Sequence, residues 1–290
     1  MSTPQQPSHS EPAYRNSTFD HFNVAAERLT GRYGDKPFCT WYDDHRDERV
    51  ELSYRSFGNW VAKTANLLVD ELGAEPGDQV GVLADHWQVP VLLAACWRAG
   101  LGVVSLELLG PVPPLVAAFV HENRLDHVPV PEATPVVALT ADPLGRAGQD
   151  LGRAQNFSRI VPSMGDEFDA GTDPPGDALT AGVETATMGQ LLASAAALAA
   201  RTGLGDTDRL LSGRFLLTPA GATAGLLAPL ATGAGVVLVS NLDPAKFWKR
   251  VADERVTVAV LDPAQAVALG DTAPPPTDRA HPPLRVLLDD

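Results

Sequence analysis

The sequence is poor in cysteine and contains no long uninterrupted hydrophobic run. Its 290 residues include two cysteines, Cys39 and Cys96, in apolar surroundings and without C-x-x-C spacing. This pattern argues against a disulfide framework or a cysteine zinc site and favours two buried, reduced thiols. The longest apolar runs cover about ten residues, whereas a membrane-spanning helix needs roughly 20. We therefore expect a soluble, cytoplasmic protein.

Basic residues are also scarce, because 22 Lys and Arg face 36 Asp and Glu and the formal net charge is −14. Such an acidic surface repels nucleic acid and anionic lipid, so we expect neither nucleic acid nor a membrane as a partner. Residues 1–17 are rich in Ser, Pro and Gln and have no apolar central region. This composition predicts a disordered tail and argues against a signal peptide.

What the sequence does have is an alternation of short apolar segments with amphipathic ones, and 44% of its residues are hydrophobic. Strands that alternate with helices are typical of a mostly parallel sheet covered on both faces. The predicted fold class is α/β, with two lobes of mostly parallel β-sheet flanked by helices. Strands are expected at 37–42, 50–54, 79–84, 101–106, 136–140, 209–217, 236–239, 256–261 and 284–288. Helices are expected at 18–31, 57–71, 85–97, 115–123, 191–200, 226–230 and from 244 onward. Thr18, Asp85 and Asp243 are the expected N-caps of three of them.

Composition suggests where the lobes divide. Between 142 and 177 the periodic pattern gives way to Gly, Pro, Asp and Arg, which indicates a long connection. We therefore predict a first α/β lobe at 18–141, an irregular connection at 142–177 and a second α/β lobe at 178–290.

The stretch 179–198 draws attention because a strand end, a glycine-containing turn and a helix follow one another there. That arrangement can present the free N–H groups of a helix start to a phosphate. The turn contains neither Lys nor Arg and carries the acidic Glu184 instead. Thr187 and Gln190 have the spacing of a capping box, so the helix can satisfy its own N–H groups.

Several segments together resemble the N-terminal domain of the adenylate-forming superfamily, the acyl-CoA synthetases and their relatives. The likeness spans about 18 to 288, and the chain resembles in particular a group of short actinobacterial proteins that lack the phosphate loop and the C-terminal domain. The segments that carry it are Leu-Ser-Tyr-Arg-Ser-Phe at 52–57, Glu-Pro-Gly-Asp-Gln-Val at 75–80, Ala-Ala-Cys-Trp-Arg-Ala-Gly at 94–100, Leu-Leu-Ala-Pro-Leu-Ala-Thr-Gly at 226–233 and Glu-Arg-Val-Thr-Val at 254–258.

The resemblance implies a phosphate loop of the form Thr-Ser-Gly-Thr-Thr-Gly-x-Pro-Lys-Gly at 180–189. Thr180, Gly182 and Gly189 match it, but the lysine position holds Met188, and Val183, Glu184, Thr185 and Thr187 also depart from the pattern. Loss of a charge-assisted donor and gain of a carboxylate both disfavour ATP phosphates. The loop is therefore expected to be vestigial, with Thr180, Gly182, Glu184, Thr185 and Gly189 as its remnants.

No catalytic or metal-binding residue can be assigned through the resemblance. The family's adenine-contacting segment, its ribose-binding aspartate and its catalytic lysine would all follow Asp290. Three local patterns resemble ligand sites but have simpler structural explanations. The glycine-containing tract at 218–225 lacks the lysine that follows a phosphate loop, and the charged segment at 43–48 is expected to be a solvated hairpin tip. The group His121, Glu122, Asp126 and His127 is expected to be a solvated helix end, because its spacing does not suit zinc.

Two functions remain open. The chain is either a non-catalytic homologue that binds a small ligand, a protein partner or a second copy of itself, with no cofactor, or half of a split ligase. The second alternative requires another polypeptide to complete an ATP-dependent acid–thiol ligase, with ATP and Mg²⁺ held partly by Thr180 and Thr185. An identifiable nucleophile and base are lacking in either case.

Overall fold

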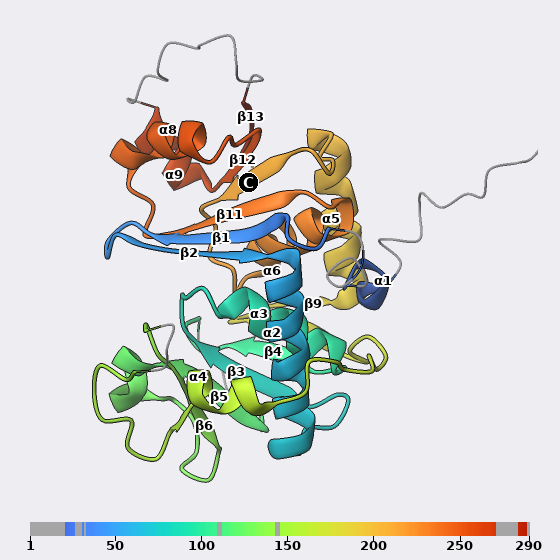
Figure 1. The fold of residues 1–290 in the computed structure, drawn as a ribbon, viewed down its shortest axis with the longest axis vertical. Helices are drawn as coiled ribbons and strands as arrows, with labels where there is room; N and C mark the ends of the chain where they lie inside the picture. The colour runs from blue at the N-terminus through green and yellow to red at the C-terminus, as the bar shows by residue number, and fades with distance from the viewer. Residues whose placement is uncertain are drawn as a thin grey trace, which may run out of the picture.

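A computed structural model describes residues 21–26, 31, 33–108, 112–142, 146–270 and 284–288. Within these residues the chain forms two mostly parallel sheets, each with helices on its faces. Figure 1 shows one sheet in the upper half of the molecule and the other in the lower half. The predicted α/β class with two mostly parallel sheets flanked by helices is confirmed. The proposed tail and the predicted helix cap Thr18 lie outside the described residues.

The upper sheet has six strands among the described residues, in the order β13-β12-β10-β11-β1-β2. All neighbours are parallel except β1 and β2, which form the predicted hairpin. This six-stranded sheet consists of β1 (Pro37–Asp43), β2 (Glu48–Ser53), β10 (Arg209–Ser212), β11 (Gly235–Ser240), β12 (Val258–Leu261) and β13 (Arg285–Leu288).

The lower sheet has seven strands in the described part of the chain, in the order β7-β6-β5-β3-β4-β8-β9. Only β8 and β9 are antiparallel. This seven-stranded sheet consists of β3 (Gln79–Leu83), β4 (Gly102–Ser105), β5 (Ala117–His121), β6 (Val136–Leu139), β7 (Gln155–Asn156), β8 (Asp177–Ala181) and β9 (Glu184–Thr187).

The two sheets do not follow the predicted division of the chain at 142–177. The N-terminal strand β1 pairs with β11 of the six-stranded sheet, and Figure 1 shows these blue and orange strands side by side. In the opposite direction, β8 pairs with β4 of the seven-stranded sheet. Composition marks exposed connections but does not say which strands pair, so it could not reveal this exchange.

Two local predictions are wrong. The segment 115–123, expected to be a helix, contains the fully buried strand β5, followed by the 3₁₀ helix η4 (Glu122–His127). A strand buried on both faces has a continuous apolar sequence that periodicity cannot distinguish from a buried helix. Asp85 does not cap the next helix, because α3 (Val89–Arg98) begins after Gln88. Asp85 is thereby left at the end of β3, outside the helix.

Helices lie between the sheets and on their outer faces. The main core packs α2 and α3 with α5 and α7, and Phe22 of α1 meets Trp97 of α3 edge to face. A second core lies under α8 and α9 on the other face of the six-stranded sheet. The longer helices are α2 (Tyr54–Asn66), α3, α5 (Met188–Thr202) and α8 (Pro244–Asp253), and the shorter ones are α1 (Phe22–Ala26), α4 (Phe157–Ile160), α6 (Pro219–Ala222), α7 (Ala228–Thr232) and α9 (Pro263–Leu269).

Cys39 and Cys96 are free and buried, as predicted. Burial raises the pKa of both thiols because it disfavours the thiolate. Among the described residues, none of the helices is both long and apolar enough to cross a lipid bilayer.

Candidate functional site

The carboxyl ends of strands from both sheets face one cavity. Asp85 follows β3, Glu107 follows β4 and His121 ends β5, while Asp43 ends β1 and Asn241 follows β11. These residues line a cleft of about 500 Å³. Parallel α/β sheets bind ligands at the carboxyl ends of their strands. The inter-sheet cleft, as we call this cavity, is therefore the first candidate site.

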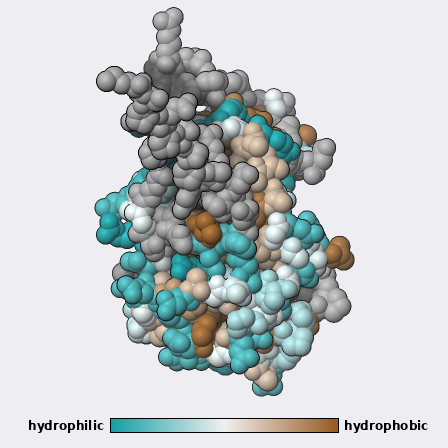
Figure 2. All heavy atoms as spheres, turned by 90° about the vertical axis from the view of Figure 1, so that its right-hand side faces the viewer, coloured by the Kyte–Doolittle hydropathy of each residue, from teal (hydrophilic) through white to brown (hydrophobic). Residues whose placement is uncertain are grey.

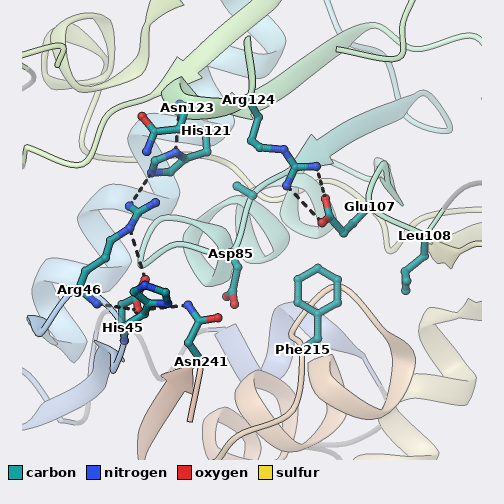
Figure 3. A pocket seen from close by; sticks show the side chains of 12 residues that line it. His45, Arg46, Asp85, Glu107, Leu108, His121, Asn123, Arg124, Phe215 and Asn241 are labelled. Atoms are coloured by element: carbon teal, nitrogen blue, oxygen red, sulfur yellow. Dashed lines mark hydrogen bonds and ion pairs between the residues drawn. The ribbon is translucent and has the colours of Figure 1, made fainter. Parts of the chain in front are cut away.

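Figure 3 shows how the lining side chains lie, with Asp85 and the ring of Phe215 pointing into the space between the sheets. Arg46 lies on one side, where its Nε is 3.7 Å from the Asp43 carboxylate. Arg124 lies on the opposite side, with its Nη2 3.0 Å from the Glu107 carboxylate. Both arginine charges in the cleft thus have a carboxylate partner.

Asp85 is in a different situation. Its carboxylate accepts a hydrogen bond from the Ser240 hydroxyl at 2.7 Å, and no ion pair with a cationic side chain is found for it in the described part of the chain. The side chain is open to the cleft, yet protein atoms surround the carboxylate on most sides. This partial burial raises the pKa of Asp85, and the nearby charges of Asp43 and Glu107 raise it further.

His86 is the least satisfied polar side chain of the site. It is 1% exposed, and neither ring nitrogen has a hydrogen-bond partner among the described residues. Gln88 lies near enough to favour the charged form weakly, without reaching hydrogen-bonding geometry. Burial, together with His121 and Arg46, lowers the pKa of His86 to about 3. The imidazole is therefore neutral at physiological pH.

His121 connects His86 to the cleft. Its ring lies 5.3 Å from the His86 ring, centroid to centroid. Arg46 Nη1 approaches His121 Nε2 at 3.4 Å, and the Asn123 amide approaches Nδ1 at 3.3 Å. A neutral imidazole has a single acceptor nitrogen, so it accepts from one of these donors at a time. Burial, followed by the Arg46 charge, lowers the pKa of His121.

A smaller cavity of about 240 Å³ adjoins the inter-sheet cleft. The two share Asp85, Phe215 and Asn241, and we call the smaller one the inner cavity. Trp41 and His86 lie in its wall. The Trp41 indole donates to Ser240 Oγ at 3.0 Å, and Ser240 in turn donates to Asp85. This chain of hydrogen bonds fixes the orientation of the Asp85 carboxylate.

The segment 180–189, where the resemblance places a phosphate loop, forms a different kind of structure. Thr180 of β8 and Thr185 of β9 face each other as a cross-strand pair, and Ala181 faces Glu184. Gly182 forms the turn with φ of +65°, and a Cβ there would lie 2.7 Å from the Leu108 carbonyl oxygen. Glu184, Thr185 and Gly189 are exposed. The five remnant residues therefore do not converge on one point.

The helix after this hairpin begins with the predicted capping box. The Gln190 amide donates to Thr187 Oγ1 at 3.3 Å, while Gln190 Oε1 accepts from the Thr187 amide at 2.9 Å. A third cavity of about 420 Å³ lies beside this segment, with Glu184, Arg201 and Arg214 in its wall. The loop position thus has cationic neighbours that its own sequence does not supply.

The tract at 218–225 is a helix start, not a phosphate loop. Thr218 caps α6 by accepting from the Gly221 amide. A Cβ at Gly221 would lie 1.9 Å from the Phe215 carbonyl oxygen, so the close approach of the backbone requires glycine. Within the described ranges, no three His, Cys, Asp or Glu residues form a group that could hold a metal ion.

Sequence reasoning missed the residues of the inter-sheet cleft. The sequence predicts a solvated hairpin tip for Asp43, His45 and Arg46 and a helix cap for Asp85, but all four residues line the cleft. The signal was present, because Asp85 and Glu107 each follow a predicted buried strand directly. What the sequence did not contain was the pairing order that brings those strand ends together.

Comparisons with known proteins agree with the fold. The family model described as "AMP-binding enzyme" matches residues 26–117. The chain resembles an acyl-CoA synthetase of Brucella canis, with a TM-score of 0.67 and 16% identity, over 86% of this chain and 48% of that one. It also resembles the inhibitor-bound N-terminal domain of FACL13 from Mycobacterium tuberculosis, with a TM-score of 0.66 and 14% identity over 87% and 65% of the two chains. Our chain thus spans about half the length of the Brucella enzyme.

A relative at the sequence level is a Mycobacterium tuberculosis protein named "TIGR03089 family protein". It is 36% identical over 224 residues, which are 76% of this chain and 90% of that protein. The predicted resemblance is therefore confirmed, and the chain belongs to the same family as this mycobacterial protein, within the adenylate-forming (AMP-binding) superfamily.

Proposed function

We propose that this protein is a catalytically degenerate member of the adenylate-forming superfamily, a pseudoenzyme that binds a ligand or a partner without activating an acyl group. The observation that supports this most is the structure at 180–189. A tight hairpin replaces an open phosphate loop there, and the helix that follows is closed by its own capping box. The inter-sheet cleft supports the binding role, because the exposed Asp85 carboxylate lines it without a cationic partner among the described residues.

The residues at 180–189 do not fit ATP and Mg²⁺. Thr180 and Thr185 face each other across the hairpin, and the exposed Glu184 carboxylate would repel a triphosphate. One of the helix-start N–H groups already donates to Thr187. We therefore propose a function without a cofactor and derive no step that involves one.

A protein partner or a second copy of the chain is part of this proposal. Among the described residues, β13 lies at one edge of the six-stranded sheet, where a further strand can add. On the face drawn in Figure 2, the most hydrophobic residues form separate spots among polar ones. The described part of that face thus offers no broad apolar surface, and we propose the strand edge as the contact. The net charge of −14 argues against nucleic acid or a membrane, and we propose a cytoplasmic location.

The alternative is half of a split acyl-adenylate-forming ligase that another polypeptide completes. One observation favours it: Arg201 and Arg214 line the cavity next to Glu184 and could supply the charge that the loop lacks. Under this alternative the protein would use ATP and Mg²⁺ in an acid–thiol ligase reaction.

Calorimetric titration of the full chain with ATP and Mg²⁺ at near-physiological salt separates the two functions. We expect no saturable heat at millimolar ATP, and no acyl-adenylate when fatty acids and other carboxylic acids are added. A dissociation constant below about 1 mM, which corresponds to roughly 4 kcal/mol of binding free energy, would reject the degenerate function. The search would then turn to the polypeptide that completes the ligase.

A further inference from the structure

The inner cavity contains a buried polar group that the protein leaves without a partner. Both ring nitrogens of His86 are inaccessible to solvent and lack hydrogen bonds within the described structure. An unpaired buried donor or acceptor destabilises the fold, and buried polar groups are almost always satisfied. His86 lies in the wall of the inner cavity, so a molecule placed there lies beside the imidazole, and a rotation of the ring would turn a nitrogen toward it.

The charged side chains around the two adjoining cavities indicate whether that molecule is a cation or an anion. Four carboxylates and three guanidinium groups line them. Asp43 and Glu107 are paired with arginines, and Asp262 is engaged as the cap of α9 by its hydrogen bond from the Gln265 amide. Asp85 is left with a hydroxyl as its partner. The residues are Asp43, Asp85, Glu107 and Asp262, with Arg46, Arg124 and Arg214.

Aromatic rings complete the surroundings of Asp85. Trp41 and Phe215 both line the inner cavity together with Asp85 and His86. The Trp41 ring lies 5.5 Å from the His86 ring, centroid to centroid. Aromatic faces attract cations through the ring quadrupole, and more strongly where water is excluded. A carboxylate beside aromatic rings is chemically suited to a protonated amine.

We propose that the inter-sheet cleft and its inner cavity bind a small organic ammonium ion, with Asp85 as the counter-charge, His86 as a neutral hydrogen-bond partner, and Trp41 and Phe215 as the aromatic walls. The inference rests on the proposed ligand-binding function and names its ligand class. An anionic ligand suits the cleft less well, because Arg46 and Arg124 are paired with carboxylates, Arg214 donates to the Leu261 carbonyl oxygen, and Asp85 would repel it. The two cavities, about 500 Å³ and 240 Å³, can hold an amine with an aromatic or alkyl tail.

The experiment uses three probes of similar size that differ in charge. Isothermal titration of the full chain with 2-phenylethylamine, 2-phenylethanol and benzoate at pH 7.5 compares a cation, a neutral molecule and an anion. Hydrogen bonds to charged groups are worth more than neutral ones. We therefore expect the amine to bind at least about 10-fold more tightly than the alcohol, and benzoate to bind more weakly than both.

Two variants locate the binding. Asp85→Asn keeps the shape and removes the charge, so we expect it to abolish the preference for the amine over the alcohol. Asp126→Asn is the matched control, because Asp126 is exposed on η4 and does not line either cavity. The affinity of this variant for the amine should lie within about 2-fold of that of the unmodified chain, because salt screens an exposed charge that lies away from the cavities. Imidazole NMR signals of His86 should move with the amine and remain unchanged with benzoate.

Equal affinity for amine and alcohol, tighter binding of benzoate, or an unchanged preference in Asp85→Asn would each overturn the inference. The absence of binding of methylamine, butylamine and 2-phenylethylamine at up to 10 mM would also overturn the inference. Such a site should bind at least one of these amines with a dissociation constant below about 10 mM. The probe comparison needs no variant, so it holds even if Asp85→Asn fails to fold. Acyl-adenylate formation combined with charge-selective amine binding would reject the proposed function while supporting the ammonium site.

Discussion

Two regions at the carboxyl ends of strands differ in whether their polar groups have partners within the protein. At 177–190, where the superfamily resemblance places a phosphate loop, the hairpin and the capping box satisfy the polar groups locally. In the inter-sheet cleft and its inner cavity, Asp85 lacks a cationic partner and the ring nitrogens of His86 lack hydrogen bonds among the described residues. Satisfied groups stabilise a fold, whereas unsatisfied buried groups cost stability and are retained where a ligand uses them.

A cluster packed against the six-stranded sheet provides a reference for buried charges that are paired, although Arg250 Nε has no hydrogen-bond partner among the described residues. Asp44 and Arg250 form a buried ion pair, in which Arg250 Nη1 donates to Asp44 Oδ2 at 2.9 Å. The same carboxylate accepts from the Asp243 amide, and the Arg250 guanidinium lies over the Tyr42 ring. This pair and the His86 site are both buried, so they differ in satisfaction more than in exposure. The predictions below test that difference in decreasing order of effect.

Removal of Asp44 should have the largest effect. Asp44→Ala leaves the Arg250 charge buried without its partner, and breaking such a pair costs about 3–5 kcal/mol. The free energy of unfolding, measured by urea denaturation, should fall by that amount. Asp253→Ala is the control, because Asp253 forms an exposed pair with Lys249 and such pairs contribute less than about 1 kcal/mol. A similar loss in both variants would show that burial and satisfaction do not govern these groups.

His86 should make stability depend on acid pH. The pKa of its imidazole is about 3 in the folded protein, against an ordinary value of 6.5 for a solvated histidine. Between these values the unfolded chain binds a proton that the folded chain does not. Stability should therefore fall as the pH drops below about 6.5, at about 1.4 kcal/mol per pH unit from this group.

The variant His86→Phe isolates that contribution. It should reduce the loss between pH 6 and pH 5 by about 1.4 kcal/mol, and it should not destabilise the ligand-free protein at pH 7.5. His127→Phe, at an exposed position of η4, should retain the pH dependence of the unmodified chain. Urea titrations at several pH values measure both variants. An unchanged slope in His86→Phe would mean that the imidazole has a partner in solution.

Removal of the capping box should have a moderate effect. Thr187→Ala deletes the side-chain acceptor for the Gln190 amide at the start of α5. Loss of an N-cap residue costs about 0.5–2 kcal/mol. Ser194→Ala, on an exposed position of the same helix, should leave the free energy of unfolding within about 0.5 kcal/mol. If Thr187→Ala is as stable as the control, the closed structure of the loop region does not depend on its cap.

A charge reversal in the hairpin should have the smallest effect. Glu184 is exposed, so Glu184→Lys should change stability by less than about 0.5 kcal/mol. Because the hairpin geometry remains closed, the added lysine should not create measurable ATP binding in calorimetry. Saturable ATP binding by the variant would show that charge alone, and not the closed structure, had removed the phosphate site.

Much of the local structure follows from the sequence. The hairpin of β1 and β2, the cap of α8 by Asp243 and the capping box of Thr187 and Gln190 match their predictions. Each depends on residues within about six positions of one another, so local propensity is sufficient. The strand β5 was mistaken for a helix because its apolar run reflects burial on both faces, which depends on distant neighbours.

The candidate site could not be predicted in the same way. Asp85 lies far from Phe215 and Asn241 in the sequence, and the three meet because strands of both sheets end at one cleft. By itself the sequence determined the α/β class, the superfamily resemblance and the loss of the loop residues, since these depend on residue identity and local pattern. Only the tertiary structure decided that β1 joins the C-terminal strands and that β8 joins the N-terminal ones. Strand pairing is a non-local choice, and it places Asp85 and His86 opposite Phe215 and Asn241 at a cavity where Asp85 has no cationic partner and the His86 ring no hydrogen bond among the described residues.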